Sequence, residues 1–196
     1  SSVLIIGAVV IQRQLNYLLK EDMGFEKNQK VIFPIRAEGS RPQIGSFRNQ
    51  LRALPEVNNV SGMTAYPGRF VPNDISMYKE GESMNSATVI RFAFTDEHFV
   101  NTLKVKLLAG RNFTPQDTSS DFSKAKVLVN QTVLKTMNIS QEEAIGMVLR
   151  SDREGGEQIQ YTIIGVFQDI NFERMSEEIK PYMVRIASPQ DLPQVI

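Results

Sequence analysis

The stretch Ala87–Gly110, ATVIRFAFTDEHFVNTLKVKLLAG, indicates the fold class because it combines strand and helix patterns within a few residues. Residues 87–94 are rich in β-branched and aromatic side chains, which favour a strand. Asp96 is a residue type that caps helices, so we expect a short helix over 97–103. Residues 104–107 alternate between polar and apolar side chains, which predicts a half-exposed strand. The stretch therefore predicts an α+β fold.

The segment before this stretch predicts a strand–helix–strand unit. Residues 31–35 are rich in strand-forming side chains, and Pro34 among them indicates an edge strand or a bulge. Residues 57–65 are expected to form the returning strand. The prolines and glycine of the segment 66–73 then indicate a subdomain boundary.

The helix of this unit is expected to follow Ser40, with Pro42 in its first turn, and to end at Pro55. Its apolar face is predicted to consist of Ile44, Phe47, Leu51 and Leu54. Arg48 and Arg52 are expected to lie on the other faces of the helix.

The C-terminal half predicts further short elements with recognisable ends. We expect strands over 75–78, 127–129 and 182–187, and a hairpin of 147–152 with 158–167 around Gly155-Gly156. Asn130 is expected to cap a helix over 131–137. Ser140 and Glu143 have the spacing of a capping box, and Gly146 is expected to end the helix that they begin.

The N-terminus carries an apolar run, residues 3–11, whose helical apolar stripe continues to Leu19. A membrane-spanning helix needs about 20 apolar residues, so this run is too short to span by itself. We interpret it as the outer end of a transmembrane helix that stops near Gly24, with Tyr17 at the membrane–water interface. The alternative is a buried helix of a soluble domain.

The composition excludes several classes of protein. Lysine plus arginine and aspartate plus glutamate each number 22, so the net charge is zero, which argues against a nucleic-acid partner. Cysteine is absent, which excludes disulfides, zinc–cysteine sites and thiol nucleophiles. This composition fits an extracytoplasmic location.

Candidate catalytic, metal-binding and phosphate-binding residues are few. His98 stands beside Asp96 and Glu97 and could act as a general base in a hydrolase, but sequence neighbours on a short helix do not face one another. Gly155-Gly156 lies between two strands rather than before a helix, which favours a turn over a phosphate loop. Arg111 fits an arginine packed over a turn better than an anion site. We expect no enzyme activity, no catalytic residue, no metal site and no cofactor.

Three ordered stretches give the chain a resemblance to a known family. They are Gln14–Tyr17 with Asp22–Gln29, Phe94–Phe99 running into Leu103–Phe113, and Ala144–Gly146 with Ile163–Phe172. In this order and spacing they resemble the MacB-like periplasmic core domain of MacB/FtsX-type ABC transporter permeases, in its Bacteroidetes-like version. The resemblance covers almost the whole chain.

The resemblance implies a porter-like α/β subdomain that is interrupted by a smaller α/β insertion and preceded by a membrane-proximal helix. Its implied divisions are 1–26 for the outer end of the transmembrane helix and stalk, 27–70 and 158–196 for the porter-like subdomain, and 71–157 for the insertion. It gives Asp96 the role of a helix cap, Phe99 that of a core anchor and Gly110 that of a turn with positive φ. It places Gly165 in a strand that another backbone approaches closely.

The function that the resemblance implies is transmission of ATP-driven motion to periplasmic substrate or partner proteins, in efflux or in export of lipoproteins or peptides. The implied partners are a cytoplasmic ABC ATPase subunit, a second permease copy or half, a periplasmic adaptor or substrate protein, and the bacterial inner membrane, with the domain facing the periplasm. Two alternatives remain open: a ligand-sensing extracytoplasmic domain of a membrane receptor, and a hydrolase that uses His98 with Asp96 or Glu97.

Overall fold

The computed structural model describes the chain over residues 5–7, 9–10, 12–13, 29–35, 38–68, 73–118, 123–153, 155–173, 178–188, 191–192 and 194–196. Its strands are β1 (Phe33–Pro34), β2 (Gly62–Met63), β3 (Asp74–Lys79), β4 (Thr88–Thr95), β5 (Leu107–Gly110), β6 (Lys124–Asn130), β7 (Val148–Asp152), β8 (Gln158–Phe167), β9 (Tyr182–Ile186) and β10 (Gln194–Val195). Its helices are α2 (Ile44–Arg52), α3 (Phe99–Leu103), α4 (Gln131–Thr136) and α5 (Gln141–Ala144), with 3₁₀ turns η1 (Glu38–Gln43), η2 (Met84–Ser86) and η3 (Pro115–Asp117). This mixture confirms the predicted α+β class.

Six strands close into a ring, here called the barrel: β3, β4, β9, β6, β8 and β7. The closing step is the parallel pairing of β4 with β9, which aligns Arg91–Thr95 with Tyr182–Ile186. The neighbouring pairs are antiparallel, except for the parallel pair β6–β8. Because every strand of a closed ring has two partners, the barrel leaves few unpaired edges.

The interior of the barrel is a hydrophobic core to which all six strands contribute. Its buried residues include Met77, Ile90, Val127, Leu149, Ile163 and Met183, one from each strand, together with Val133 and Leu134 of α4. Helix α4 follows β6 directly, so it closes the end of the barrel at which β6 finishes. A second core on the outer face packs α3, through Phe99 and Leu103, against β4, β6, β8 and β9.

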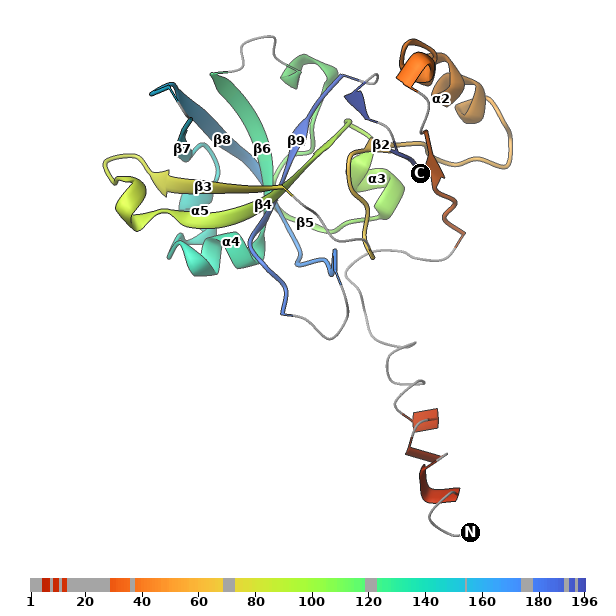
Figure 1. Cartoon of the computed structure of the whole chain (residues 1–196), viewed down its shortest axis with the longest axis horizontal. Helices are drawn as coiled ribbons and strands as arrows, with labels where there is room; N and C mark the ends of the chain where they lie inside the picture. Colours follow the sequence, from red (N-terminus) through yellow and green to blue (C-terminus); the bar gives the residue numbers. More distant parts are fainter. Residues whose placement is uncertain are drawn as a thin grey trace.

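A small second layer, here called the end unit, consists of β1, β10, β2 and α2. Strand β10 lies between β1 and β2, and all three are antiparallel to their neighbours. Helix α2 covers these strands through a small core of Ile44, Val60 and Val195. Figure 1 shows α2 at one side of the molecule and β7 at the other, with the barrel between them.

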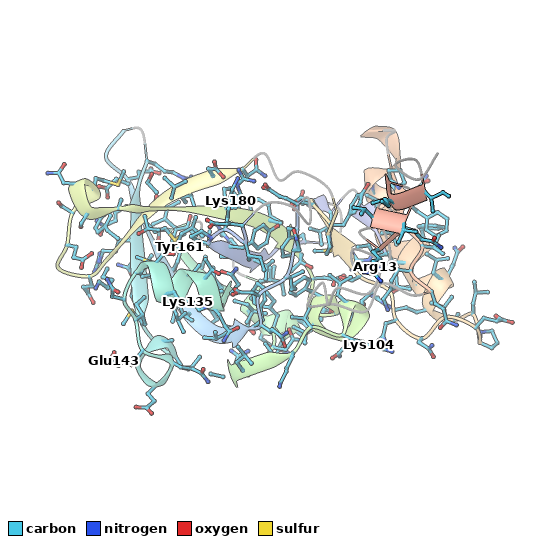
Figure 2. The ribbon with its side chains drawn as sticks, turned by 90° about the horizontal axis from the view of Figure 1, so that it is seen from below. Arg13, Lys104, Lys135, Glu143, Tyr161 and Lys180 are labelled. Carbon is cyan, nitrogen blue, oxygen red and sulfur yellow. The ribbon has the colours of Figure 1, made fainter. Side chains whose placement is uncertain are left out.

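Several local predictions are confirmed. Asn130 caps α4 by accepting the Val133 N–H, and Ser140 accepts the Glu143 N–H at the start of α5. Strands β7 and β8 form the predicted hairpin. Figure 2 shows that Glu143 projects from the edge of the molecule, whereas Tyr161 of β8 lies inside its body.

The two glycines with a predicted backbone role are also confirmed. Gly110 has φ +72°, and a Cβ there would lie 2.2 Å from the carbonyl oxygen of Ile164. A Cβ on Gly165 would lie 2.6 Å from the carbonyl oxygen of Arg111. Strands β5 and β8 pair directly at these two glycines, so neither tolerates a side chain.

Other local predictions were wrong in their bounds. The helix after Ser40 begins as the 3₁₀ turn η1, which contains Pro42, and becomes α-helical at Ile44. The expected strand 57–65 is reduced to β2, Gly62–Met63. The expected strand 104–107 is displaced to β5 because Lys104 ends α3 in the left-handed conformation, with φ 52°.

The expected divisions at 26, 70 and 157 stay predictions. Strand β8, which begins at Gln158, pairs with β7 and β6 in the barrel, while β10 pairs with β1 and β2. The described residues 5–7, 9–10 and 12–13 are helical, and Tyr17 and Gly24 lie outside the described part of the chain. Within the described ranges, no helix combines the length and hydrophobicity that a membrane crossing requires.

Candidate functional site

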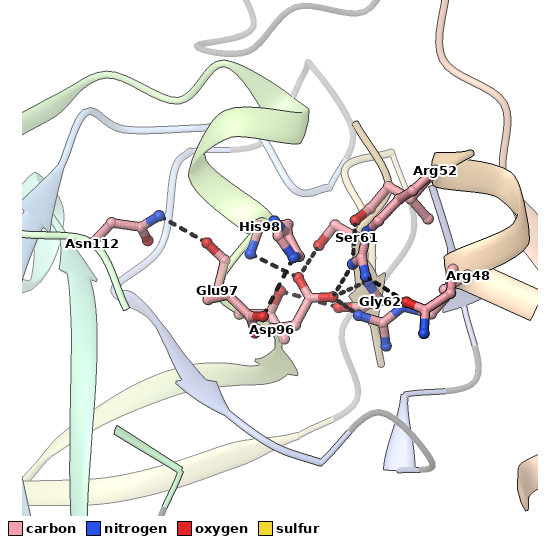
Figure 3. A network of polar contacts seen from close by, with 11 residues as sticks. Arg48, Arg52, Ser61, Gly62, Asp96, Glu97, His98 and Asn112 are labelled. Carbon is pink, nitrogen blue, oxygen red and sulfur yellow. Dashed lines mark hydrogen bonds and ion pairs between the residues drawn. The ribbon is translucent and has the colours of Figure 1, made fainter. Parts of the chain in front are cut away.

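The carboxylate of Asp96, at the end of β4, is the centre of a buried polar network (Figure 3). Its Oδ1 accepts hydrogen bonds from Ser61 Oγ at 2.7 Å and from the His98 N–H at 3.0 Å. Its Oδ2 accepts the Gly62 N–H at 2.8 Å and forms an ion pair with Arg48 Nη2. Because Ser61, Gly62 and Arg48 belong to the end unit or its flank, the network joins that unit to the barrel.

The Arg48–Asp96 ion pair is closed to solvent. The two side chains are 3% and 2% exposed. Burial, together with the nearby positive charge of Arg52, lowers the pKa of Arg48 to about 10, so the guanidinium still carries its charge at neutral pH. Among the described residues, Nε and Nη1 of Arg48 have no hydrogen-bond partner. Asp96 is the carboxylate in direct contact with Arg48, and Glu97 acts on it electrostatically from a greater distance. Loss of Asp96 or Arg48 would leave the other as a buried, unpaired charge.

The absence of a side chain at Gly62 leaves room for the guanidinium of Arg48. A Cβ on Gly62 would lie 2.7 Å from Arg48 Nη1 and 2.9 Å from Cβ of Leu192. Arg52, one turn later on α2, adds a second cation at 3.9 Å from Asp96 and donates a hydrogen bond to the carbonyl of Val60 at 2.9 Å. Helix α2 is thus fastened to β2 and to β4 by two arginines on one face.

The structure places the candidate catalytic residues around this network but gives them different contacts from those expected. His98 binds Asp96 through its backbone N–H, whereas its ring Nε2 lies 3.3 Å from Glu97 Oε1. The expectation that these neighbours do not face one another was therefore wrong. Burial and the charge of Arg52 lower the pKa of His98 below its usual value, which favours the neutral ring. Among the described residues, no cluster of three or more acidic or histidine side chains could hold a metal ion.

Asp96 is also not the N-cap that the sequence predicted. Helix α3 begins at Phe99, and its N-cap position is His98, whose side chain makes no capping hydrogen bond. Asp96 accepts one N–H from this turn, and its other contacts are the long-range ones to the end unit. Phe99 is fully buried, as its predicted role of core anchor requires.

Arg111 packs over a turn, as expected, and pairs there with a carboxylate. Its two terminal nitrogens donate to Asp117 at 2.6 and 2.9 Å, and Lys126 Nζ lies 2.7 Å from the same carboxylate. The side chain of Asp117 is 1% exposed, and the hydrogen bonds from Arg111 hold its pKa well below the usual range. Gly155 and Gly156 both have positive φ in the β7–β8 turn, as a hairpin requires.

Arg48 is the residue that sequence reasoning missed. It lies four residues after Ile44 and three before Leu51, so it shares the inward face of α2 with them. That spacing was the available signal, because a charged residue on an apolar stripe needs a buried partner. The partner, Asp96, is 48 positions further along the chain and could not be identified by a local pattern.

The network is connected to the C-terminal strand by backbone hydrogen bonds. It connects the ends of the described body to its centre: Ser61 exchanges two backbone hydrogen bonds with Ile196, each of 2.9 Å, while its hydroxyl binds Asp96. Strand β10, which ends beside Ile196, also pairs with β1. Strands β1 and β10 are therefore linked to Asp96, and through it to β4, by strand pairing and hydrogen bonds.

Comparison with known proteins agrees with the resemblance seen in the sequence. The family model described as the MacB-like periplasmic core domain matches residues 4–194. The crystal structure of the periplasmic region of MacB from Actinobacillus actinomycetemcomitans has a TM-score of 0.56 at 15% identity, over 91% of this chain and 78% of that one. A domain assigned to a permease of Porphyromonas gingivalis has a TM-score of 0.50 at 17% identity, over 83% of this chain and 67% of that one. A search of curated protein sequences gives no match.

Proposed function

Because the chain belongs to the family of MacB-like periplasmic core domains of ABC transporter permeases, we propose that it transmits ATP-driven motion to a periplasmic substrate or partner protein. Family membership makes it the periplasmic domain of a membrane protein and implies an ATPase partner. The proposal adds that the ATPase subunit is cytoplasmic and that the permease lies in the inner membrane, where it works with a second permease copy or half. It also adds that the protein that receives the motion is a periplasmic adaptor or substrate protein.

The observation that carries the proposal is the buried ion pair between Arg48 and Asp96. Removing one partner of a buried ion pair costs about 3–5 kcal/mol, because the remaining charge is left buried and unpaired. Arg48 and Asp96 therefore require one another in the folded chain, and the contacts of Asp96 to Arg48, Ser61 and Gly62 hold the end unit against the barrel. A force that arrives at β1 or β10 moves both units as one body, which is what a transmission element requires.

The proposal assigns no catalytic role to the domain. The carboxylate of Asp96 is used to bind Arg48, Ser61 and backbone N–H groups, so it does not orient the His98 ring. The His98 ring contacts Glu97, at the surface, where both side chains are about one third exposed. This arrangement supports a structural role for the residues that a hydrolase would have used.

The test measures movement of the barrel in the assembled transporter. The sequence has no cysteine, so a single cysteine at Met84, which is 43% exposed on η2, accepts a fluorophore without side reactions on this domain. Energy transfer from this fluorophore to a dye on the lipid headgroups reports the height of the barrel above the membrane. We expect the transfer efficiency to change when the ATPase subunit binds ATP and to return after hydrolysis.

The control is the same transporter with an ATPase subunit that cannot bind nucleotide, in which the efficiency should stay constant. An efficiency that is the same with and without ATP in the active transporter would contradict the proposal.

A further inference from the structure

The end of the barrel opposite α4 carries a charged residue on an inward-facing position. On β9, Met183 belongs to the interior core, and Arg185 is the next residue on the same side. Strand register places Arg185 opposite Val127 of β6 and opposite Phe94 of β4. The apolar interior therefore ends, at this mouth, in a guanidinium group.

Arg185 has no acidic partner among the described residues. No carboxylate there lies within ion-pair distance of it, and its described contact is the ring of Phe94, 6.0 Å from its guanidinium carbon. Partial burial lowers the pKa of Arg185, because the charged form loses hydration. A partly buried arginine with an aromatic ring as its main partner has donors available for an anion.

Tyr161 supplies a second donor at the same mouth. Tyr161 is 3% exposed and faces the interior of the barrel. Its strand register pairs it with Ala125 of β6 and Leu149 of β7. Within the described ranges its hydroxyl makes no hydrogen bond, so its O–H is available to donate one to a ligand. Burial raises the pKa of Tyr161, so the hydroxyl keeps its proton at neutral pH and can donate it.

The charge around the two residues is positive. Arg153, in the β7–β8 turn, lies close enough to act electrostatically on both Arg185 and Tyr161. Two arginines near one tyrosine, with no described acidic side chain paired to either, make a local excess of positive charge. Such an excess attracts anions and is screened by salt.

We propose that Arg185 and Tyr161 bind an organic carboxylate at this end of the barrel. The guanidinium fork matches the two oxygens of a carboxylate, the tyrosine hydroxyl donates a further hydrogen bond, and the ring of Phe94 contacts the apolar part of the ligand. A phosphate ion carries more charge and more oxygens than these donors can satisfy. The inference does not rest on the proposed function, since it concerns the barrel alone.

The test uses benzoate as the probe and benzamide as its neutral counterpart of the same shape. Each is titrated into the ¹⁵N-labelled chain, and the resonances of β9 and of the β7–β8 hairpin are followed by NMR. We expect saturable shifts with benzoate, at a dissociation constant in the millimolar range, and none with benzamide. Inorganic phosphate should bind at least tenfold more weakly; binding as tight as that of benzoate would overturn the assignment to carboxylates.

Variants connect the binding to the two residues. R185Q should weaken benzoate binding by tenfold or more, and Y161F by a few-fold, while R150Q, which removes a charge on β7 that is paired with Glu80, should leave it unchanged. R185K keeps the positive charge but lacks the paired N–H donors of the guanidinium, and it replaces R185Q in the test if R185Q does not fold. It should also bind benzoate more weakly than the wild type. The absence of saturable shifts with benzoate, or equal binding by the wild type and the Arg185 variants, would overturn the proposal. The guanidinium of Arg185 would then be hydrated and bind no ligand.

Discussion

Arg48 on α2 and Asp96 at the end of β4 form an ion pair in which both side chains are almost completely buried. The two residues come from different units of the fold, and Asp96 also binds Ser61 and Gly62 beside the strand that leads back to β10. One carboxylate therefore fastens the helix of the end unit and its inner strand to the barrel. The predictions below follow from this contact and from three other contacts elsewhere in the fold.

Replacing Asp96 by Asn should destabilise the chain by about 3 kcal/mol, because the buried guanidinium of Arg48 loses its counter-charge. The measurement is urea unfolding, with a lower midpoint at an unchanged slope. The matched control is E82Q, since Glu82 forms an exposed ion pair with Lys79 at 3.2 Å, and its midpoint should stay at the wild-type value. Equal midpoints for D96N and E82Q would refute the role given to the ion pair.

Replacing Gly165 by Ala should destabilise the chain by about 2–3 kcal/mol. The new Cβ would lie 2.6 Å from the Arg111 carbonyl oxygen and 2.8 Å from Leu128 Cδ2, so β5 and β8 would have to separate. G45A is the control, because Gly45 lies within α2 with no atom near the position of a Cβ. It should stabilise the chain by about 0.5–1 kcal/mol through helix propensity. Thermal unfolding of both variants shows whether each substitution lowers or raises the melting temperature.

Replacing Asn130 by Ala should destabilise the chain more than the equivalent change at Ser140. The Asn130 side chain accepts the N–H groups of Val133 and Tyr182 and donates to the carbonyl of Lys180, so it joins α4 to β9. Ser140 makes local contacts, both with Glu143. We expect a loss of about 2–3 kcal/mol for N130A and about 1 kcal/mol for S140A in urea unfolding. Similar losses would show that Asn130 acts as a cap alone.

The Asp117 carboxylate should make stability depend on pH in the acid range. Hydrogen bonds from Arg111 lower the pKa of Asp117 below its ordinary value of 3.8, so below pH 5 the unfolded state binds more protons than the folded state. Its contribution is therefore complete above about pH 5, begins to be lost as the pH falls through 3.8, and is lost fully only below the still lower pKa of the folded state. D117N should be less stable than the wild type by about 2 kcal/mol at pH 7, and the difference should shrink toward pH 2. A difference independent of pH would contradict this assignment.

The sequence predicted the elements whose cause is local. A cap such as Asn130 is determined by the residue type and its position before an apolar helix. The β7–β8 hairpin follows from two strand patterns around a pair of glycines. These features need no knowledge of the rest of the chain.

The features that were missed depend on contacts between distant segments. The parallel pairing of β4 with β9 closes the barrel across about 90 residues, and nothing in either strand's pattern specifies the other. Strand β10 has two residues and exists because β1 and β2 flank it. Arg48 was expected on a face other than the apolar one, although its spacing from Ile44 indicated that it shares the buried face.

The central claim is that the end unit and the barrel move as one body because Arg48 binds Asp96. The most direct measurement is the distance between spin labels on cysteines at Leu54 and Met84, two exposed positions that lie on opposite sides of the ion pair, in a chain with no other cysteine. Double electron–electron resonance of the assembled transporter, with one doubly labelled permease copy in each complex, should give one narrow distance distribution that is the same with and without ATP, and D96N should broaden it. A wild-type distribution that shifts on ATP binding, or a D96N distribution as narrow as that of the wild type, would contradict the claim.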